Sequence, residues 1–590
     1  MSGYAAPLAE IRFALDAIAG LPEIAKLPGY ENASADVVDA VLDEAAKLAG
    51  NIIAPLNRIG DTEKTRLENG VVRTPGGFKE AYRAYVAGGW SGLSASPEHG
   101  GQGLPVALDA AVNEMWMSAN LAWSLCPMLS IGAGELLELL GTPEQKRRYL
   151  GRLVSGEWTG TMNLTEPQAG SDLGALRTRA VREGDHYRIT GQKIFITWGE
   201  HDMADNVVHF VLARLPDAPA GNKGISLFLV PKFLVNDDGN LGTRNDLRCV
   251  SLEHKLGIHA SPTCVMSYGD DGGSIGTLVG EENRGLEAMF IMMNAARLHV
   301  GLQGVAIGER AYQQARAYAR ERIQGKPIGA KDGAKLPIVH HPDVRRMLLS
   351  MRAASEAARA LAYYTAGEAD RARRLPDATQ RARAQARLDL LTPVVKAWCT
   401  DLGVETASTG IQVHGGMGFI EETGAAQHWR DARIAPIYEG TNGIQANDLV
   451  GRKLLRDRGA AAADLIAEMR RTLTQLDGHD ADGHLTHGVD ALERATAALI
   501  ATAASDLGAT LAGAEPYLRL LGTVAGGWLM ARSAAAATRR LKAGMGDRPF
   551  LEAKIATARF YAEHRLAQAP ALLPAIAGGA TVMGFDLDLI

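Results

Sequence analysis

Two short runs of this chain carry residue types that could do chemistry. The first run, APIYEGTNGIQ at 435–445, places the carboxylate Glu439 in a loop between two helix-like stretches. A loop carboxylate that is removed from water can serve as a general base, whereas a solvated one has no such role. The second run, LTEPQAGSD at 164–172, offers small hydroxyls and glycine, which let the backbone approach a planar, anionic ligand closely. The first run supplies a candidate base, and the second a candidate ligand-binding loop.

The composition is that of an ordinary globular protein with several domains. Its 590 residues exceed the roughly 250 to 300 at which one hydrophobic core stops growing. The chain is 46% hydrophobic and 22% charged, and its formal net charge of -5 gives no global attraction to nucleic acid or anionic lipid. We therefore expect no nucleic-acid partner.

Cysteine usage and the N-terminal residues indicate a reducing compartment. The four cysteines are widely spaced and form no C-x-x-C pair, so neither a disulfide framework nor a zinc or other metal site is predicted. The first residues carry Glu10 and Asp16 and lack a basic segment before an apolar core, which argues against a signal peptide. No run approaches the roughly 18 uninterrupted apolar residues of a membrane span. We expect a cytoplasmic location.

Helical periodicity at both ends of the chain surrounds a β-rich middle. Apolar residues at i, i+3, i+4 spacing predict helices, and short β-rich runs between Gly, Asp, Asn and Pro predict strands joined by loops too short for crossover helices. The predicted helices are 34–54, 78–88, 106–150, 286–322, 342–370, 378–414 and 441–456, and the predicted strands are 186–197, 207–214 and 224–231.

The order of these elements predicts an α+β multidomain chain. We expect an N-terminal α-helical domain at 1–159, a middle antiparallel β domain at 160–282, a C-terminal four-helix bundle at 283–456 and an additional helical domain at 457–590. The last region holds thirteen basic and fifteen acidic residues, which gives it a charge of -2. It is not a basic arm. No G-x-G-x-x-G occurs, so a Rossmann-type dinucleotide site is not indicated.

Three motifs in order resemble those of the acyl-CoA dehydrogenase family over roughly residues 80–455. They are TEPxxGSD at 165–172, QxxGGxGF at 412–419 and YEGTN at 438–442. The runs HKLGIHASPTC at 254–264 and VGEENRGL at 279–286 are similar to the large subgroup that includes 3-methylmercaptopropionyl-CoA dehydrogenases. The resemblance implies the acyl-CoA dehydrogenase-like fold, with FAD held between the β domain and the C-terminal bundle.

The resemblance also implies a reaction at the Cα–Cβ bond of an acyl-CoA thioester. Family members remove the α proton with a carboxylate while hydride passes to flavin N5, and the product is a trans-2-enoyl-CoA. Because that proton is only weakly acidic, the base needs a raised pKa and the thioester carbonyl needs fixed donors. Glu439 matches the base, and its backbone N–H together with a flavin ribityl hydroxyl would hold the thioester oxygen.

Several residues match family positions that contact FAD. Thr165 and Thr197 match hydrogen-bonding positions at the isoalloxazine edge, and Ser171, with Gly170 before it, matches the pyrophosphate contact. Phe195 stands where many relatives have tryptophan, and either ring can cover the flavin face. The remaining matches are Arg322, which corresponds to a family arginine that reaches the FAD pyrophosphate of a neighbouring subunit, and Gln412, Gly416 and Thr441, which would supply the other flavin contacts. Read singly, Thr165 could be an ordinary turn residue, Arg322 a helix C-terminal charge and Gly416 a helix cap.

Other positions match the substrate side of the family site. Tyr438 and Gly440 flank the base, Arg297 matches an arginine near the catalytic pocket, and Asn294 stands where relatives often have an acidic residue facing the CoA chain. A polar helix-surface role is the alternative for Arg297 and Asn294. We expect His414 to be a packed or capping imidazole rather than a catalyst.

Three functions are compatible with the resemblance. The first is an acyl-CoA dehydrogenase that passes electrons to an electron-transferring flavoprotein. The second is an acyl-CoA oxidase that uses dioxygen. The third is a DNA-binding alkylation-response flavoprotein of the same fold, which would need a basic C-terminal domain, and the charge of -2 argues against it. We also expect the C-terminal tail to cover a surface that smaller relatives use for tetramerisation, which would leave a homodimer.

Overall fold

The computed structural model describes residues 3–328, 335–476, 478, 480 and 482–589, and the chain divides into two compact units. One unit comprises Met1–Ala46, Pro105–Ser118 and Arg297–Ile590, and is built from helices. The other comprises Lys47–Leu104 and Ala119–Ala296, and contains the β-sheet. Each unit is therefore assembled from segments that are distant in sequence.

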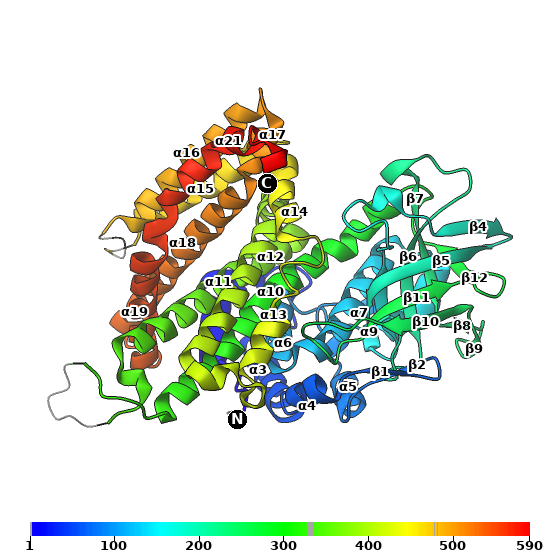
Figure 1. The fold of residues 1–590 in the computed structure, drawn as a ribbon, viewed down its shortest axis with the longest axis horizontal. Helices are drawn as coiled ribbons and strands as arrows, with labels where there is room; N and C mark the ends of the chain where they lie inside the picture. The colour runs from blue at the N-terminus through cyan, green and yellow to red at the C-terminus, as the bar shows by residue number, and fades with distance from the viewer. Residues whose placement is uncertain (1–2, 329–334, 477, 479, 481, 590) are drawn as a thin grey trace. The chain divides into compact units, whose positions relative to one another are not determined.

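Two long helices, α11 and α12, pack along each other in the helical unit (Figure 1). Both helices bury alanine and leucine side chains, and α11 also buries Tyr363 and Tyr364. The helices of the bundle and of the N-terminal segment are α1 Leu8–Ala14, α2 Leu21–Ile24, α3 Ala35–Leu48, α6 Val106–Ala119, α10 Gly285–Glu321, α11 Pro342–Arg374, α12 Ala378–His414, α13 Ala425–Ala432 and α14 Asn442–Asn447.

The additional C-terminal region packs onto this bundle. Its helices are α15 Ala460–Leu473, α16 His484–Ala503, α17 Leu507–Ala512, α18 Ala514–Lys542, α19 Arg548–His564, α20 Leu573–Ala577 and α21 Gly579–Met583. Helix α18 contacts α11, α12 and α19. Trp398 of α12 lies against α18 where Gly522 and Gly526 leave room: an added Cβ would lie 2.5 Å and 2.7 Å, respectively, from its indole ring. Trp398 is thus a buried core residue.

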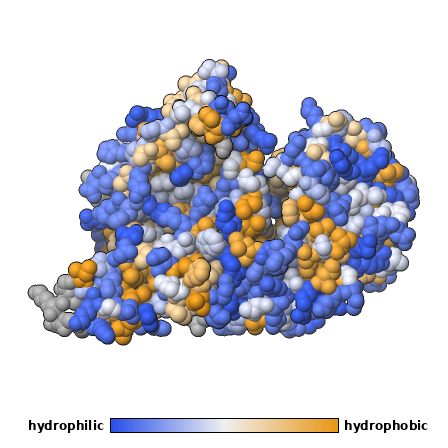
Figure 2. Space-filling view, in the orientation of Figure 1, coloured by the Kyte–Doolittle hydropathy of each residue, from blue (hydrophilic) through white to orange (hydrophobic). Residues whose placement is uncertain are grey.

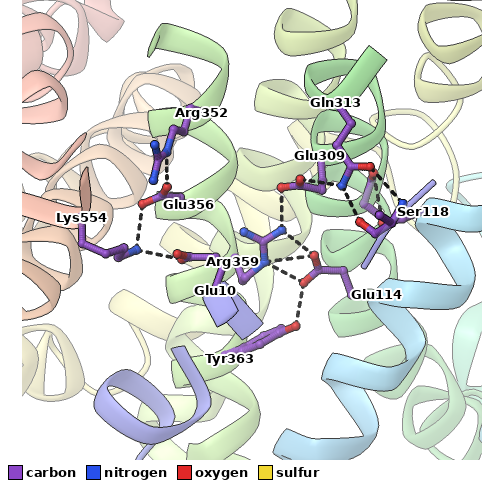
Figure 3. Close-up of polar contacts among 12 residues, drawn as sticks. Glu10, Glu114, Ser118, Glu309, Gln313, Arg352, Glu356, Arg359, Tyr363 and Lys554 are labelled. Carbon is purple, nitrogen blue, oxygen red and sulfur yellow. Dashed lines mark hydrogen bonds and ion pairs between the residues drawn. The ribbon is translucent and has the colours of Figure 1, made fainter. Parts of the chain in front are cut away.

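Buried charges also join the additional region to the bundle and to the N-terminal segment (Figure 3). Lys554 of α19 donates to Glu10 Oε1 of α1 at 2.8 Å and to Glu356 Oε2 of α11 at 2.7 Å. Arg352 binds the other oxygen of Glu356 at 2.6 Å. Lys554 is only 2% exposed and pairs with both carboxylates, whereas Arg352 pairs with Glu356.

A second buried cluster lies beside it on α11. Arg359 Nη2 lies 2.6 Å from Glu114 Oε1 of α6 and 2.9 Å from Glu309 Oε2 of α10, and Tyr363 donates to Glu114 Oε2 at 2.7 Å (Figure 3). Three helices far apart in sequence are thus held by one guanidinium, whose fork suits paired carboxylates.

An eight-stranded sheet forms the core of the other unit. Its order is β10-β11-β5-β12-β7-β6-β3, and β4 pairs with β5 and β6. Its inner face buries an apolar cluster that includes Ile189, Val211, Phe228 and Met266. The strands are β3 Thr159–Asn163, β4 Arg179–Glu183, β5 His186–Thr197, β6 Val207–Arg214, β7 Ile225–Pro231, β10 Leu247–Leu252, β11 Thr263–Tyr268 and β12 Ser274–Leu278. Two-stranded sheets pair β1 Arg66–Glu68 with β2 Val71–Arg73, and β8 Phe233–Val235 with β9 Leu241–Arg244.

Helices α4 Leu56–Glu63, α5 Phe78–Ala87, α7 Leu121–Leu140, α8 Pro143–Gln145 and α9 Gly151–Ser155 complete this unit. Helix α7 is the one helix in the described part of the chain that is long and apolar enough to cross a membrane. Most of it is buried, and it packs against β3, as expected for a core helix. Figure 2 shows hydrophilic side chains over much of the visible face, interrupted by separate apolar patches.

The predicted α+β fold is confirmed, and three element bounds coincide with their predictions: α12, β5 and β6. The continuous helix predicted at 106–150 is wrong, because Asn120 adopts an extended conformation and caps α7 by accepting from Trp123 N at 3.1 Å. The purely antiparallel pattern also needs correction. β3 pairs with β6 in parallel, and β4 meets β6 in parallel at Arg179.

Candidate functional site

Glu439 lies in a strained turn between α13 and α14. Its φ of 54° is left-handed, and the following Gly440 has φ 81°. A left-handed conformation costs a non-glycine residue roughly 1–2 kcal/mol, so the surrounding contacts must hold it. The turn is closed by Tyr438 N donating to Ile434 O at 3.1 Å and by Asn442 N donating to Pro436 O at 2.9 Å. The predicted base is thus presented by a fixed backbone.

Two buried cations lie in the electrostatic environment of Glu439. Burial raises the pKa of this half-buried carboxyl above its usual range, while Arg297 and Lys396 act in the opposite direction. The guanidinium of Arg297 is close to the turn, since a Cβ added to Gly440 would lie 3.7 Å from Arg297 Nη2. Arg297 Nη1 also lies 3.8 Å from Asp448 Oδ2. A carboxyl with a raised pKa beside cations is suited to accept a proton near neutral pH.

Residues on either side of Glu439 attach the turn to neighbouring helices. The Tyr438 hydroxyl donates to Gln303 Oε1 on α10. Gln445 Nε2 donates to Gly440 O at 3.3 Å, and a Cβ added to Gly440 would lie only 2.6 Å from this nitrogen. Thr441 caps α14 by accepting from Ile444 N at 3.3 Å. Glycine at 440 is therefore required by both its φ and its neighbours.

Close helix packing brings Arg297 and Lys396 to the same place. Glycines on α10 let α12 approach: a Cβ added to Gly301 would lie 2.8 Å from Val395 O, and one added to Gly304 would lie 2.1 Å from Cys399 O. Gly403 on α12 faces Gly304 in the same way. Larger residues at these positions would separate the helix that carries Arg297 from the helix that carries Lys396.

In the β-sheet unit, a buried ion pair holds the loop that carries Thr165. Lys193 of β5 donates to Glu166 Oε1 at 2.8 Å and to Leu164 O at 2.9 Å, and Ile194 N donates to Thr165 O at 2.9 Å. Burial would raise the pKa of Glu166, but Lys193 and hydrogen bonds from Thr178 and the Arg177 backbone hold it at about 2. The glutamate of the TEPxxGSD motif thus has a structural role here.

Phe195 presents its ring through an irregularity in β5. Between the pairs Ile196–Cys264 and Lys193–Met266, strand β5 has one more residue than β11, which defines a β-bulge. Phe195 has φ 60° there, and 58% of the residue is exposed. A bulge of this kind re-aims a side chain, so the ring is available to cover a planar ligand.

The other predicted flavin residues of this unit fit the cofactor in size and chemistry. Thr165 and Thr197 are partly exposed, and Gly170 and Ser171 are exposed. A Cβ added to Gly170 would meet nothing within 4 Å, so a ligand can approach this backbone. Hydroxyls, open backbone and one aromatic face match what a flavin with its pyrophosphate needs.

The structure places the remaining predicted site residues as follows. In the helical unit, Gln412 near the end of α12 is exposed, as is Gly416, and neither Gly415 nor Gly416 has an atom within 4 Å of an added Cβ. Arg322 is exposed one residue beyond α10, with its guanidinium 3.5 Å from Gln324 Oε1. Asn294 is exposed on α10 within the β-sheet unit.

Sequence reasoning missed Lys396, Asn442 and the Glu166–Lys193 pair. A lysine inside the apolar run PVVKAWC at 393–399 was the available signal for Lys396, because lysine is rarely buried without a partner. The prediction for His414 is confirmed: it is buried, stacks on Tyr318 at 4.5 Å and contacts Gly410 O at 2.7 Å.

Comparison with known proteins gives matches along nearly the whole chain. Family models match residues 39–157 (acyl-CoA dehydrogenase, N-terminal domain), 161–270 (middle domain), 283–455 (C-terminal domain) and 465–586 (acetyl-CoA dehydrogenase C-terminal like). The chain is 51% identical over 576 residues to a 3-methylmercaptopropionyl-CoA dehydrogenase of Ruegeria pomeroyi, covering 96% of this chain and 97% of that protein.

Solved structures agree in fold. An acyl-CoA dehydrogenase complexed with FAD from Bacillus anthracis superposes with a TM-score of 0.73 at 20% identity, covering 96% of this chain and 91% of that one. A chain in the structure of the electron transferring flavoprotein of Acidaminococcus fermentans gives a TM-score of 0.58 at 26% identity, covering 72% and 98%. The chain belongs to the acyl-CoA dehydrogenase family and is an FAD-dependent oxidoreductase that acts on acyl-CoA.

Proposed function

We propose that Glu439 is the base that removes the α proton of the acyl-CoA thioester. The observation that carries this proposal is the conformation of the turn: a half-buried carboxyl with a raised pKa is held at φ 54° between buried cations. Backbone strain and a carboxyl pKa raised by burial are both typical of catalytic residues. Neither is expected of a solvated carboxylate in a loop.

The chain's residues provide for the proton, and the cofactor provides for the hydride. Bound FAD supplies the acceptor, N5, for the hydride that leaves Cβ. Glu439 takes the α proton, the Cα–H and Cβ–H bonds break, and the Cα–Cβ double bond of a trans-2-enoyl-CoA forms. The backbone N–H of Glu439 is proposed to bind the thioester oxygen, while Arg297 stabilises the carboxylate before the proton arrives.

Replacement of the base tests this proposal. Glu439→Gln is expected to retain bound yellow FAD and the native circular dichroism but to lose turnover by several orders of magnitude, because an amide cannot accept the α proton. The exposed Glu98 offers a matched control, and Glu98→Gln should leave turnover unchanged. Turnover by Glu439→Gln within tenfold of the wild type would remove Glu439 from the mechanism.

We propose 3-methylmercaptopropionyl-CoA as the substrate. The support is the 51% identity to the Ruegeria pomeroyi enzyme over nearly the full length of both chains. Anaerobic bleaching of the flavin should be fastest with this thioester in a panel that includes butyryl-CoA and long-chain acyl-CoA. Faster bleaching by an unsubstituted chain would assign a different substrate without affecting the role of Glu439.

We also propose an electron-transferring flavoprotein as the electron acceptor. Structural similarity to a chain in the Acidaminococcus fermentans flavoprotein structure supports it. The alternative is an oxidase. Reduced enzyme should reoxidise slowly in air-saturated buffer and quickly with an electron-transferring flavoprotein, whereas rapid reoxidation by dioxygen alone would establish the oxidase.

The last part of the proposal concerns Arg322 and the number of subunits. The exposed guanidinium just beyond α10 is proposed to reach the FAD pyrophosphate of a partner subunit in a cytoplasmic homodimer. The four free, buried cysteines fit a reducing compartment. Arg322→Ala should lower the FAD content after gel filtration, and light scattering should give a dimer. Unchanged FAD content would refute the role of Arg322, and a tetramer would refute the dimer.

A further inference from the structure

A buried lysine lies in the middle of the long helix α12, among apolar residues. Lys396 is fully buried within the run PVVKAWC at 393–399. Burial of a charged side chain costs free energy unless the charge is paired or hydrogen-bonded. Its hydrogen bond leads to the base turn: Lys396 Nζ donates to Asn442 Oδ1 at 2.9 Å, three residues after Glu439.

Asn442 ties the base turn to α12. Its Nδ2 lies 3.1 Å from Ala397 O, 3.1 Å from Thr400 Oγ1 and 2.8 Å from Asp401 Oδ1. These donor contacts anchor the amide through its nitrogen alone. The amide oxygen accepts from Lys396 Nζ at 2.9 Å and lies 3.5 Å from Thr400 Oγ1, so the lysine makes the shorter contact and also places a cation next to the turn.

An anchor alone does not require a lysine at this position. A neutral donor could satisfy the Asn442 oxygen without the desolvation that burial of an amine brings. What distinguishes Lys396 from such a donor is its charge, and that charge acts on Glu439. Lys396 therefore favours the ionised form of Glu439 and also holds the turn in place.

The charged groups facing Lys396 come from three segments. They are Glu439 of the turn, Asp401 of α12 and Arg297 of α10, and Asp401 is in turn influenced by Glu515 and Arg519 of α18. Burial lowers the pKa of Lys396 to about 7, although the carboxylates of Glu439 and Asp401 oppose the fall. Lys396 is therefore cationic in acidic solution, partly protonated near pH 7 and neutral in alkaline solution.

We propose that Lys396 is a positioning residue for the base: it fixes the turn through Asn442, and its positive charge keeps Glu439 ionised and ready to accept the α proton. This inference rests on the proposed role of Glu439.

The pH dependence of kcat/KM separates the effect of charge from that of packing. With 3-methylmercaptopropionyl-CoA and butyryl-CoA, Lys396→Met is expected to move the acidic limb to higher pH by about one unit, because loss of a nearby cation raises a carboxyl pKa. Lys396→Arg retains a cation and should keep the limb near its wild-type position. The exposed Lys542 provides the control, and Lys542→Met should leave the limb unchanged.

The outcomes distinguish failure of this inference from failure of the proposed function. If Glu439→Gln is inactive and Lys396→Met shows the wild-type limb, the base assignment stands and the role of Lys396 is refuted. If Glu439→Gln turns over normally, the proposed function itself fails. If Lys396→Met does not fold, Asn442→Ala decides. It should lower kcat about tenfold to a hundredfold with little change in KM, through misplacement of the base, and an unchanged kcat would overturn the inference.

Discussion

Removal of the Lys554 ammonium should open the junction between the C-terminal region and the bundle in a pH-dependent way (Figure 3). In Lys554→Met, Glu356 keeps Arg352 at 2.6 Å, whereas Glu10 loses its 2.8 Å partner while only 8% exposed. Removal of one member of a buried ion pair costs roughly 3–5 kcal/mol. Because one of the two carboxylates keeps a cation, we expect about 3 kcal/mol at pH 8.

The pH dependence follows from the carboxyl of Glu10. Burial and the nearby Glu356 already raise its pKa above 4.5, and loss of Lys554 raises it further. A carboxyl whose folded-state pKa lies above its unfolded value destabilises the fold as pH rises from the unfolded value through the folded one. As the pH falls, more of Glu10 is protonated and neutral, so the loss of stability should be smaller at pH 5 than at pH 8.

Hydrogen exchange measured by mass spectrometry gives the local free energy of opening for α1 and α19. Exchange is preferable to a global melt because a chain of several domains need not unfold in two states. Glu10→Gln/Lys554→Met should recover most of the loss, since a neutral pair avoids the buried charge. Arg559→Met, at an exposed position on the same helix, is the control and should change little.

Two results would refute this reasoning. One is an equal loss of stability at pH 5 and pH 8 after correction for intrinsic exchange rates. The other is a double variant that is no more stable than Lys554→Met. Either would mean that the junction is held by packing around Lys554 rather than by its charge.

Three further predictions concern other contacts. Lys193→Met should destabilise β5 by about 3 kcal/mol in hydrogen exchange, because Glu166 stays buried without its cation; in the wild type, the Glu166 contribution is complete above pH 4.5 and is lost as the pH falls toward 2. Gly304→Ala should cost about 1–3 kcal/mol in hydrogen exchange of α10 and α12, because its Cβ would lie 2.1 Å from a carbonyl oxygen, and unchanged protection of these helices would contradict this packing. The hydrogen bond that His259 donates to the Asp61 carboxylate raises the pKa of His259 above 6.5. This contact should be fully formed below pH 6.5 and weaken as the pH rises through the raised value, and Asp61→Asn should abolish the change in α4 protection.

Hydrophobic periodicity predicted the helices and strands whose conformation follows from their local sequence. The structure confirms the predicted bounds of α12, β5 and β6: α12 lies between Asp377 and Gly415, β5 begins after Asp185 and β6 begins after Asn206. The break between α6 and α7 was missed. The stretch is apolar throughout, and the break depends on Asn120 capping the second helix with its side chain. Parallel pairing of β3 with β6 was missed because it joins strands 48 positions apart, Thr159 and Val207.

Local motifs likewise predicted the candidate site only in part. The run around Glu439 predicted a carboxylate in a loop between helices, and the structure places it there. The roles of the flavin and substrate residues and the division into four domains stay predictions. Lys396 could not be assigned, because its partner Asn442 is 46 residues away and its environment exists only after α10, α12 and the turn have packed.

The sequence by itself determined the family, the fold class and the place of the candidate carboxylate in a loop between helices, because motif spacing and hydrophobic period are properties of neighbouring residues. The tertiary structure alone decided the left-handed conformation of Glu439 and the cations beside it. It also decided which buried lysines hold which carboxylates. These features depend on desolvation and on contacts across hundreds of residues, and a charge has no fixed pKa or partner until folding has enclosed it.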